Sequence, residues 1–299
     1  MRGPARRPLA RLREVVARTA VGLAERATGS KLLALDYPPR HLAPRYGHGR
    51  TLHARLLEIL RRDDDAYPRN LETLIGYPDD LVRIDQDRGD GADPPWISSW
   101  LLGMDVVSLY GFLRAREPRA YVEIGSGAST MWARRAIRDG ALPTRITSID
   151  PEPRREVEDL CDRSVREPLE TADLAVFDEL APGDVVFMDG SHRVFENSDA
   201  TVFFLDVLPS LPAGILVGVH DILLPDDYLP MWTEYLWSEQ YLMAAHLLAE
   251  GKKTQLELAC NYVTEHSDLH RILDPLWESP QLAGVARRGF ALWLTTTGR

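Results

Sequence analysis

Two short runs of acidic residues and histidines contain the residue types that bind metals and move protons. Asp189 and His192 lie in the run Asp189-Gly-Ser-His192, and His220 is followed directly by Asp221. Carboxylates and imidazoles bind divalent cations, and a neutral imidazole can act as a general base. A single Asp or His would more often be structural, but two such runs together favour a functional site. We therefore predict a divalent-metal site formed by Asp189, His220 and Asp221.

A glycine-containing turn earlier in the chain predicts a nucleotide-type cofactor. Gly125 and Gly127 follow an apolar stretch, and glycine lets the backbone pass close beneath a ligand. The predicted helix that follows presents free N–H groups at its start, so Ser126 and Ser129 are included in the expected cofactor site. The third glycine of the dinucleotide fingerprint would fall at Thr130, so that fingerprint is broken.

Carboxylates around this turn favour S-adenosylmethionine (SAM) over NAD. Glu123 lies two residues before the first glycine, where it would repel a pyrophosphate but suit the ammonium and sulfonium groups of SAM. Asp150 lies 23 residues after Gly127, at the end of the next predicted strand, where an acidic residue accepts hydrogen bonds from ribose hydroxyls. We predict that Glu123, Asp150 and Asp189 contact the cofactor together with the glycine turn.

Strands and helices that alternate from residue 96 onward would position these groups. We expect strands at residues 119–124, 145–150, 184–188, 214–219, 254–262 and 290–297. We expect helices at residues 96–116, 129–138, 197–208, 228–249 and 269–277. This alternation predicts an α/β fold with a doubly wound, mostly parallel sheet, and the last two strands allow an antiparallel edge. The carboxyl edge of such a sheet collects the polar residues named above.

The first 95 residues carry no motif that suggests chemistry. They alternate basic helical stretches with proline-rich breaks and end in the Gly/Pro-rich run at 89–95. We expect residues 1–95 to form a helical and loop extension, and residues 96–299 to form the SAM-binding domain. The extension would serve as a lid or as the contact of a homo-oligomer, since added segments commonly give a fold its specificity.

Composition narrows the partners and the compartment. The 299 residues carry a net charge of −10, so the chain is a poor candidate for neutralising nucleic-acid phosphates. No apolar run approaches the ~18 residues that a transmembrane helix needs. Cys161 and Cys260 fit neither a metal-binding spacing nor a disulfide framework, which favours the reducing cytoplasm.

With these motifs in place, residues 119–262 resemble class I SAM-dependent methyltransferases. The Asp189–His192 run and the His220–Asp221 pair are similar to those of metal-dependent O-methyltransferases of natural-product pathways, including enzymes that act on macrolide sugars. The resemblance implies a Rossmann-like seven-stranded sheet, Asp189 and Asp221 as Mg²⁺ ligands, and His192 as the general base. It differs at His220, where the family more often has a carboxylate, and an imidazole is a poor ligand for Mg²⁺ but a better one for Mn²⁺, Fe²⁺ or Zn²⁺. The implied reaction is methyl transfer from SAM to a hydroxyl of a small molecule, such as a sugar or natural product.

Three other functions remain open from the sequence. The first is an NAD-binding Rossmann oxidoreductase, against which the missing third glycine and Glu123 argue. The second is a non-catalytic SAM-fold protein that acts through protein contacts, against which the retained motifs argue. The third is a nucleic-acid methyltransferase, which the net charge disfavours.

Overall fold

The computed structural model describes residues 19–27, 37, 41–62, 65–87, 93–153, 157–249 and 254–298. Its contacts divide the chain into two units, Met1–Leu42 and Ala43–Arg299. Within the first unit, residues 19–27 are helical; most of the basic N-terminal stretch lies outside the described residues, as do residues 89–92 of the predicted loop. Across the described ranges, no helix is long and apolar enough to cross a membrane.

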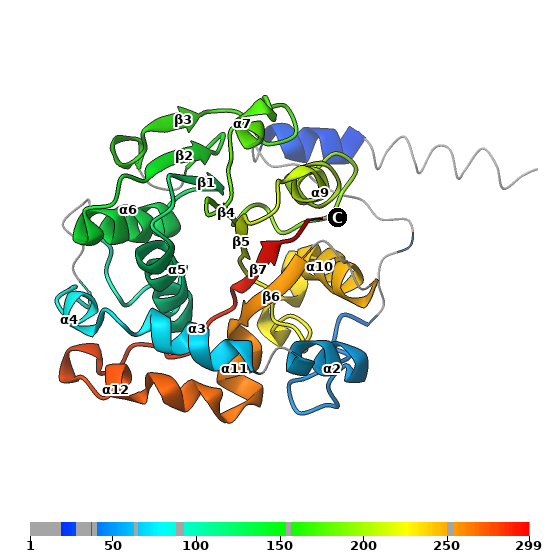
Figure 1. Cartoon of the computed structure of the whole chain (residues 1–299). Helices are drawn as coiled ribbons and strands as arrows, with labels where there is room; N and C mark the ends of the chain where they lie inside the picture. The colour runs from blue at the N-terminus through cyan, green and yellow to red at the C-terminus, as the bar shows by residue number, and fades with distance from the viewer. Residues whose placement is uncertain are drawn as a thin grey trace, which may run out of the picture. The chain divides into compact units, whose positions relative to one another are not determined.

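The second unit is built on a seven-stranded sheet with the order β3-β2-β1-β4-β5-β7-β6 (Figure 1). The strands are β1 Ala120–Ile124, β2 Arg145–Ile149, β3 Arg163–Val165, β4 Val185–Met188, β5 Leu216–Val219, β6 Thr254–Ala259 and β7 Leu292–Thr296. The first five pair in parallel, and β7 runs antiparallel to both β5 and β6. This confirms the predicted Rossmann-like, mostly parallel sheet with an antiparallel edge.

Helices cover both faces of this sheet, with α5 and α6 on one side and α10 on the other (Figure 1). The helices are α2 Ala54–Arg62, α3 Ala66–Leu74, α4 Pro78–Leu81, α5 Gly103–Arg116, α6 Ala128–Gly140, α7 Ala175–Asp178, α8 Asp199–Val202, α9 Leu208–Ser210, α10 Glu239–Leu248, α11 Cys260–His266 and α12 Asp274–Trp277. Every residue of β4 and β5 is buried. This explains why these two strands read as continuous apolar runs.

Helices α2–α4 pack with the sheet domain, although they precede residue 96. Helix α3 contacts α5 and β6, and the Asn70 side-chain amide of α3 donates to the backbone carbonyl of Glu257 on β6 at 2.7 Å. Helix α2 contacts α10. The sheet domain therefore includes a helical layer contributed by residues that carry no motif.

Several predicted elements are wrong at their ends or interiors. The predicted helix 228–249 is a 3-10 helix at Pro230–Tyr235 and then α10, separated by Leu236 in a left-handed conformation (φ 53°). The predicted strand 254–262 ends at Ala259, where α11 begins. The predicted helix 96–116 begins only at Gly103. Before it, the backbone N–H groups of Trp96 and Ile97 donate to the carbonyls of Asp85 and Gln86, and the buried Trp96 indole donates to the Leu81 carbonyl at 3.0 Å. The predicted helix 197–208 contains a π-helical turn at Phe203–Val207.

Candidate active site

The glycine turn after β1 lies directly against the end of β4. Gly125 has a φ of 79° and Gly127 a φ of 153°, conformations that favour glycine. A Cβ at Gly125 would lie 2.0 Å from the backbone oxygen of Asp189. Glycine at this position therefore allows the predicted cofactor turn and the predicted metal cluster to meet.

Glu123 lies beneath this turn and is fully buried. Its carboxylate accepts hydrogen bonds from the hydroxyls of Tyr121, Ser129 and Thr130, and the Thr130 hydroxyl in turn accepts the Gly127 N–H. Burial raises the pKa of Glu123 to about 8, although these hydroxyl bonds act in the opposite direction. The carboxylate that the sequence assigns to the cofactor thus also holds the first turn of α6.

Asp150, which follows β2, organises the same turn from the other side. Its Oδ2 accepts the backbone N–H of Ser126 at 2.8 Å and the Ser126 hydroxyl at 3.0 Å. Its Oδ1 accepts the backbone N–H of Glu152 at 2.8 Å. A depression lined by Ser126, Ser148, Asp150 and Val157 adjoins these contacts. Contact of Asp150 with the ribose stays a prediction, and Oδ1, which accepts one hydrogen bond, keeps a second lone pair for it.

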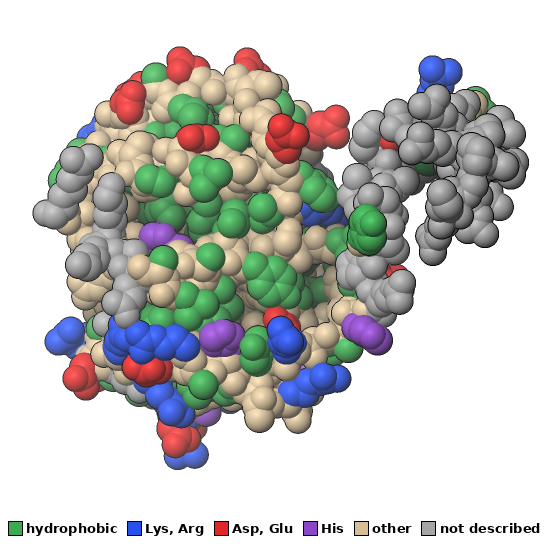
Figure 2. Space-filling view, turned by 90° about the vertical axis from the view of Figure 1, so that its right-hand side faces the viewer, with side chains coloured by type: hydrophobic (Ala, Val, Ile, Leu, Met, Phe, Trp, Pro, Cys, Tyr) green, Lys and Arg blue, Asp and Glu red, His purple; other side chains and the backbone are tan. Residues whose placement is uncertain are grey.

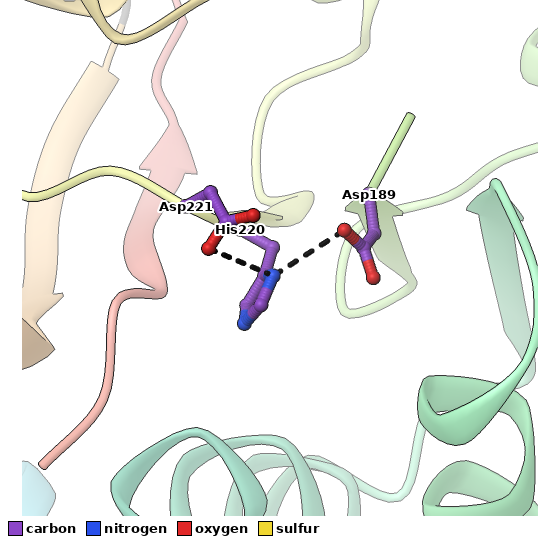
Figure 3. Close-up of side chains that lie close together, drawn as sticks. All are labelled: Asp189, His220 and Asp221. Carbon is purple, nitrogen blue, oxygen red and sulfur yellow. Dashed lines mark ion pairs between the residues drawn. The ribbon is translucent and has the colours of Figure 1, made fainter. Parts of the chain in front are cut away.

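Asp189, His220 and Asp221 come together at the carboxyl ends of β4 and β5 (Figure 3). One potential ligand atom from each lies within 4.8 Å of the others. The His220 Nδ1 is 3.3 Å from Asp189 Oδ1 and 3.6 Å from Asp221 Oδ1. The two neighbouring strand ends therefore bring together the three residues predicted as metal ligands.

The surroundings of the His220 imidazole indicate whether these residues suit a metal ion. Its Nδ1 is buried and makes no hydrogen bond to any residue that the structure describes, while its Nε2 lies 3.3 Å from Asp105 Oδ2. Metal-binding histidines commonly give their other ring N–H to a carboxylate in this way. Burial opposes protonation of His220, but Asp221, Asp189 and Asp105 outweigh it and raise its pKa well above the usual value. The same negative potential favours a bound cation, and one imidazole with two carboxylates suits Mn²⁺ better than Mg²⁺.

Asp105, near the start of α5, is a site residue that the sequence did not reveal. It is almost completely buried, and its Oδ1 accepts the backbone N–H groups of Phe290 and Ala291 at 2.6 and 2.7 Å. Its other oxygen faces His220. The available signal was a lone acidic residue inside an apolar segment, Leu101 to Tyr110, which alone does not say what it contacts.

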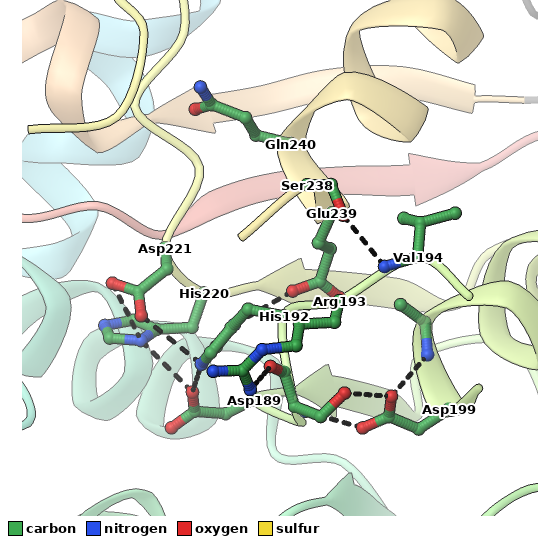
Figure 4. Close-up of polar contacts among 12 residues, drawn as sticks. Asp189, His192, Arg193, Val194, Asp199, His220, Asp221, Ser238, Glu239 and Gln240 are labelled. Carbon is green, nitrogen blue, oxygen red and sulfur yellow. Dashed lines mark hydrogen bonds and ion pairs between the residues drawn. The ribbon is translucent and has the colours of Figure 1, made fainter. Parts of the chain in front are cut away.

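His192 is buried beside the same carboxylates and points toward them (Figure 4). Its Nε2 lies 3.4 Å from Asp221 Oδ2 and 3.6 Å from Asp189 Oδ1. Its Nδ1 lies 3.0 Å from Oε2 of Glu239, the first residue of α10. Burial opposes its protonation, but the hydrogen bond to Glu239 and the charges of all three acids raise the pKa of His192 to about 9. Glu239 is a second site residue that sequence reasoning missed, because it was placed inside a predicted helix.

Aromatic side chains form one wall beside His192. The Trp237 ring centroid lies 4.5 Å from that of His192. Tyr235 and Trp232 contact Trp237 at centroid distances of 5.2 and 5.0 Å. Tyr235 is 49% exposed and neighbouring Met231 is 76% exposed, so this segment is not a core helix face. It offers apolar and aromatic surface next to the imidazole.

Comparison with known proteins gives one family match. Residues 122–222 match the family model described as a methyltransferase domain, and no curated protein matches the chain. The O-methyltransferase from Bacillus cereus, solved with S-adenosylhomocysteine (SAH), is 13% identical, with 82% of this chain and 99% of that chain covered and a TM-score of 0.40. The plantazolicin methyltransferase BpumL, also with SAH, is 12% identical over 82% of this chain and 100% of that chain, with a TM-score of 0.43.

Both TM-scores lie below 0.5, so the assignment rests on the family match and on the chain's own features. These features are the order of the seven strands, the glycine turn after β1 and the acidic residue after β2. An NAD-binding oxidoreductase is not favoured, since the matched family transfers methyl groups. Over residues 122–222 the chain therefore resembles a methyltransferase domain.

Proposed function

We propose that this protein transfers the methyl group of SAM to a hydroxyl of a small molecule, such as a sugar or natural product, with His192 as general base and a divalent metal at Asp189, His220 and Asp221. The observation that carries the proposal is the meeting of these residues with the glycine turn at one sheet edge. Methyl transfer from a sulfonium is an in-line displacement, so the enzyme mainly aligns the oxygen, methyl carbon and sulfur at ~3–3.5 Å.

The proposed cofactor site follows the carboxyl ends of β1 and β2. The backbone of Gly125, Ser126 and Gly127 would pass beneath SAM, and Asp150 would accept hydrogen bonds from the ribose. Ser129 would act indirectly, because its hydroxyl already donates to Glu123 at 3.1 Å. Burial disfavours ionisation of Glu123 in the cofactor-free protein, and the ammonium group of SAM would in turn favour the ionised carboxylate through its positive charge.

His192 can act as a base only when its imidazole is neutral, and the raised pKa of His192 disfavours the neutral form in the metal-free protein. Bound at the three ligands, a divalent cation would orient the acceptor hydroxyl, lower its pKa and offset the charges of Asp189 and Asp221. His192 would then lose two of the interactions that favour its protonation. Its Nε2, which faces both aspartates, could accept the hydroxyl proton, a contribution of typically ~10²–10⁴-fold in rate.

The aromatic wall supports a small organic acceptor. Trp237 and Tyr235 could stack on a sugar or aromatic ring next to His192. Figure 2 shows one face on which hydrophobic side chains gather between acidic side chains above and basic ones below. Among the described side chains on that face, Lys and Arg lie mostly below the hydrophobic ones, whereas a nucleic-acid phosphate chain would require a continuous basic track.

The test uses SAM labelled in its methyl group and a panel of probes, namely methyl glycosides, simple phenols and simple amines. We expect label on oxygen, loss of transfer after EDTA treatment and recovery with Mn²⁺. The variant His192→Ala should lose about 10²-fold or more in kcat while its Kd for SAH stays unchanged. Label on nitrogen alone would contradict the hydroxyl acceptor. EDTA-resistant transfer would contradict the metal, and full turnover by His192→Ala would contradict the base.

A further inference from the structure

Glu239 is a buried carboxylate whose one hydrogen-bonded side-chain partner is His192. It is 0% exposed, and its Oε2 lies 3.0 Å from the His192 Nδ1. Its Oε1 is buried and makes no hydrogen bond within the described part of the chain. Burying a carboxylate costs several kcal/mol, and a neutral side chain of the same size would avoid that cost. A buried carboxylate that lowers the stability of the fold in this way therefore calls for a role in the site.

The start of α10 also holds the backbone of His192. The His192 carbonyl accepts the N–H of Ser238 at 2.8 Å and the N–H of Glu239 at 3.2 Å. The Ser238 hydroxyl oxygen accepts the N–H of Val194 at 2.9 Å. The Trp237 ring also lies against the imidazole, with its centroid 4.5 Å from that of His192. The start of α10, whose Ser238 and Glu239 lie beside His192 in Figure 4, therefore holds both the backbone and the side chain of this residue.

We propose that Glu239 is the positioning residue for His192. It accepts the Nδ1–H of the neutral imidazole, which fixes the tautomer whose Nε2 carries a lone pair toward Asp189 and Asp221. This inference rests on the proposed function, because it gives Glu239 a role only through the base. It adds a carboxylate–imidazole pair that neither the family match nor the sequence motifs indicate.

The proton and electrons balance without a further reactant. The acceptor O–H proton moves to Nε2 of His192, and the oxygen lone pair forms the new bond to the methyl carbon. The C–S bond breaks, its electron pair stays on sulfur, and SAH is released. The imidazolium that forms keeps both N–H groups, and the negative charge of Glu239 stabilises it.

A first experiment needs no acceptor. In protein labelled with ¹⁵N-histidine and held above pH 9, where His192 is neutral, long-range ¹H–¹⁵N spectra distinguish Nδ1–H from Nε2–H, and the His192→Ala variant identifies the His192 signals. We expect a slowly exchanging Nδ1–H that Glu239→Ala loses and that the control Met243→Leu, a buried core substitution on the same helix, retains. If Glu239→Ala does not fold, the isosteric Glu239→Gln replaces it, with a changed Nδ1–H shift expected. A proton found only on Nε2, or an Nδ1–H signal that Glu239 variants leave unchanged, would overturn the proposal.

A second experiment measures coupling in the labelled-SAM assay with the probe that is methylated. We expect Glu239→Gln to lower kcat by about 10²-fold, with the KM of the probe and the Kd of SAH nearly unchanged. The double variant with His192→Ala should lose no more than His192→Ala alone, because Glu239 acts through the imidazole. Wild-type kcat in Glu239→Gln, or additive losses, would overturn the positioning role. Full activity in His192→Ala would instead overturn the proposed function.

Discussion

The buried carboxylate under the glycine turn makes the stability of the cofactor-free protein depend on pH in a predictable direction. Glu123 has an ordinary pKa of 4.5 in the unfolded chain and a pKa of about 8 in the folded protein, because it is fully buried. Below pH 4.5 both states hold the proton. As the pH rises toward 8, the unfolded chain releases its proton and the folded protein does not, so folding becomes less favourable. Above pH 8 both states are ionised and the effect levels off.

The size of the effect follows from the two pKa values. Each pH unit within the window corresponds to ~1.4 kcal/mol, so the contribution lost between pH 4.5 and pH 7 is about 3 kcal/mol. The variant Glu123→Gln keeps the shape and cannot ionise. Its oxygen can still accept bonds from the surrounding hydroxyls. We expect the free energy of unfolding of Glu123→Gln to exceed that of wild type at pH 7–8 by an amount approaching that figure. Near pH 4.5 the two free energies of unfolding should be nearly equal.

The assay is denaturant unfolding of the cofactor-free protein between pH 4.5 and pH 8.5. The quantity compared is the difference in free energy of unfolding between wild type and Glu123→Gln at each pH. The exposed residue Glu167 supplies the control, since the free energy of unfolding of Glu167→Gln should change with pH in the same way as that of wild type. A difference between wild type and Glu123→Gln that does not change with pH, or one that shrinks as the pH rises, would refute the reasoning.

Three further predictions concern the cofactor, the turn and the metal. The variant Asp150→Ala should weaken SAH binding by about 10–100-fold in calorimetry, since hydrogen bonds to a charged group contribute ~1.5–3 kcal/mol; an unchanged Kd would contradict its role. Gly125→Ala should lower the Tm far more than Gly284→Ala, because both have positive φ but only Gly125 has a backbone atom in the way; equal shifts would contradict this. Asp221→Asn should weaken Mn²⁺ binding at least about tenfold in titrations followed by electron paramagnetic resonance, and the exposed control Asp268→Asn should not.

The sheet could be predicted because its central strands carry a strong signal. Strands β4 and β5 are short apolar runs followed by polar residues, and parallel strands buried on both faces require such runs. Strands β1 and β2 are mixed, but each precedes a polar turn. Strand β3 was missed because it has three residues, two of them exposed, and so lacks an apolar pattern. The end of the 3-10 helix at Leu236 was missed because apolar residues continue through this position. A leucine in the left-handed conformation has no sequence pattern that would predict it.

The site was predictable only where the sheet itself positions it. Asp189, His192, His220 and Asp221 follow two neighbouring parallel strands, so the alternation of elements was enough to bring them together. Asp105 and Glu239 reach the same site from helices remote in the sequence. Their contacts depend on how those helices pack, which local patterns do not specify.

The backbone at the two strand ends adds an evolutionary consequence. His192 and Asp221 are both left-handed, with φ of 60° and 55°, although neither is glycine. Such conformations cost on the order of 1–3 kcal/mol each. Glycine at either position would relax the main chain but remove a side chain of the proposed site. If the proposed roles hold, selection for stability and selection for turnover act in opposite directions there. A descendant lineage released from its substrate would be expected to replace these two residues early, while leaving the buried strands that precede them intact.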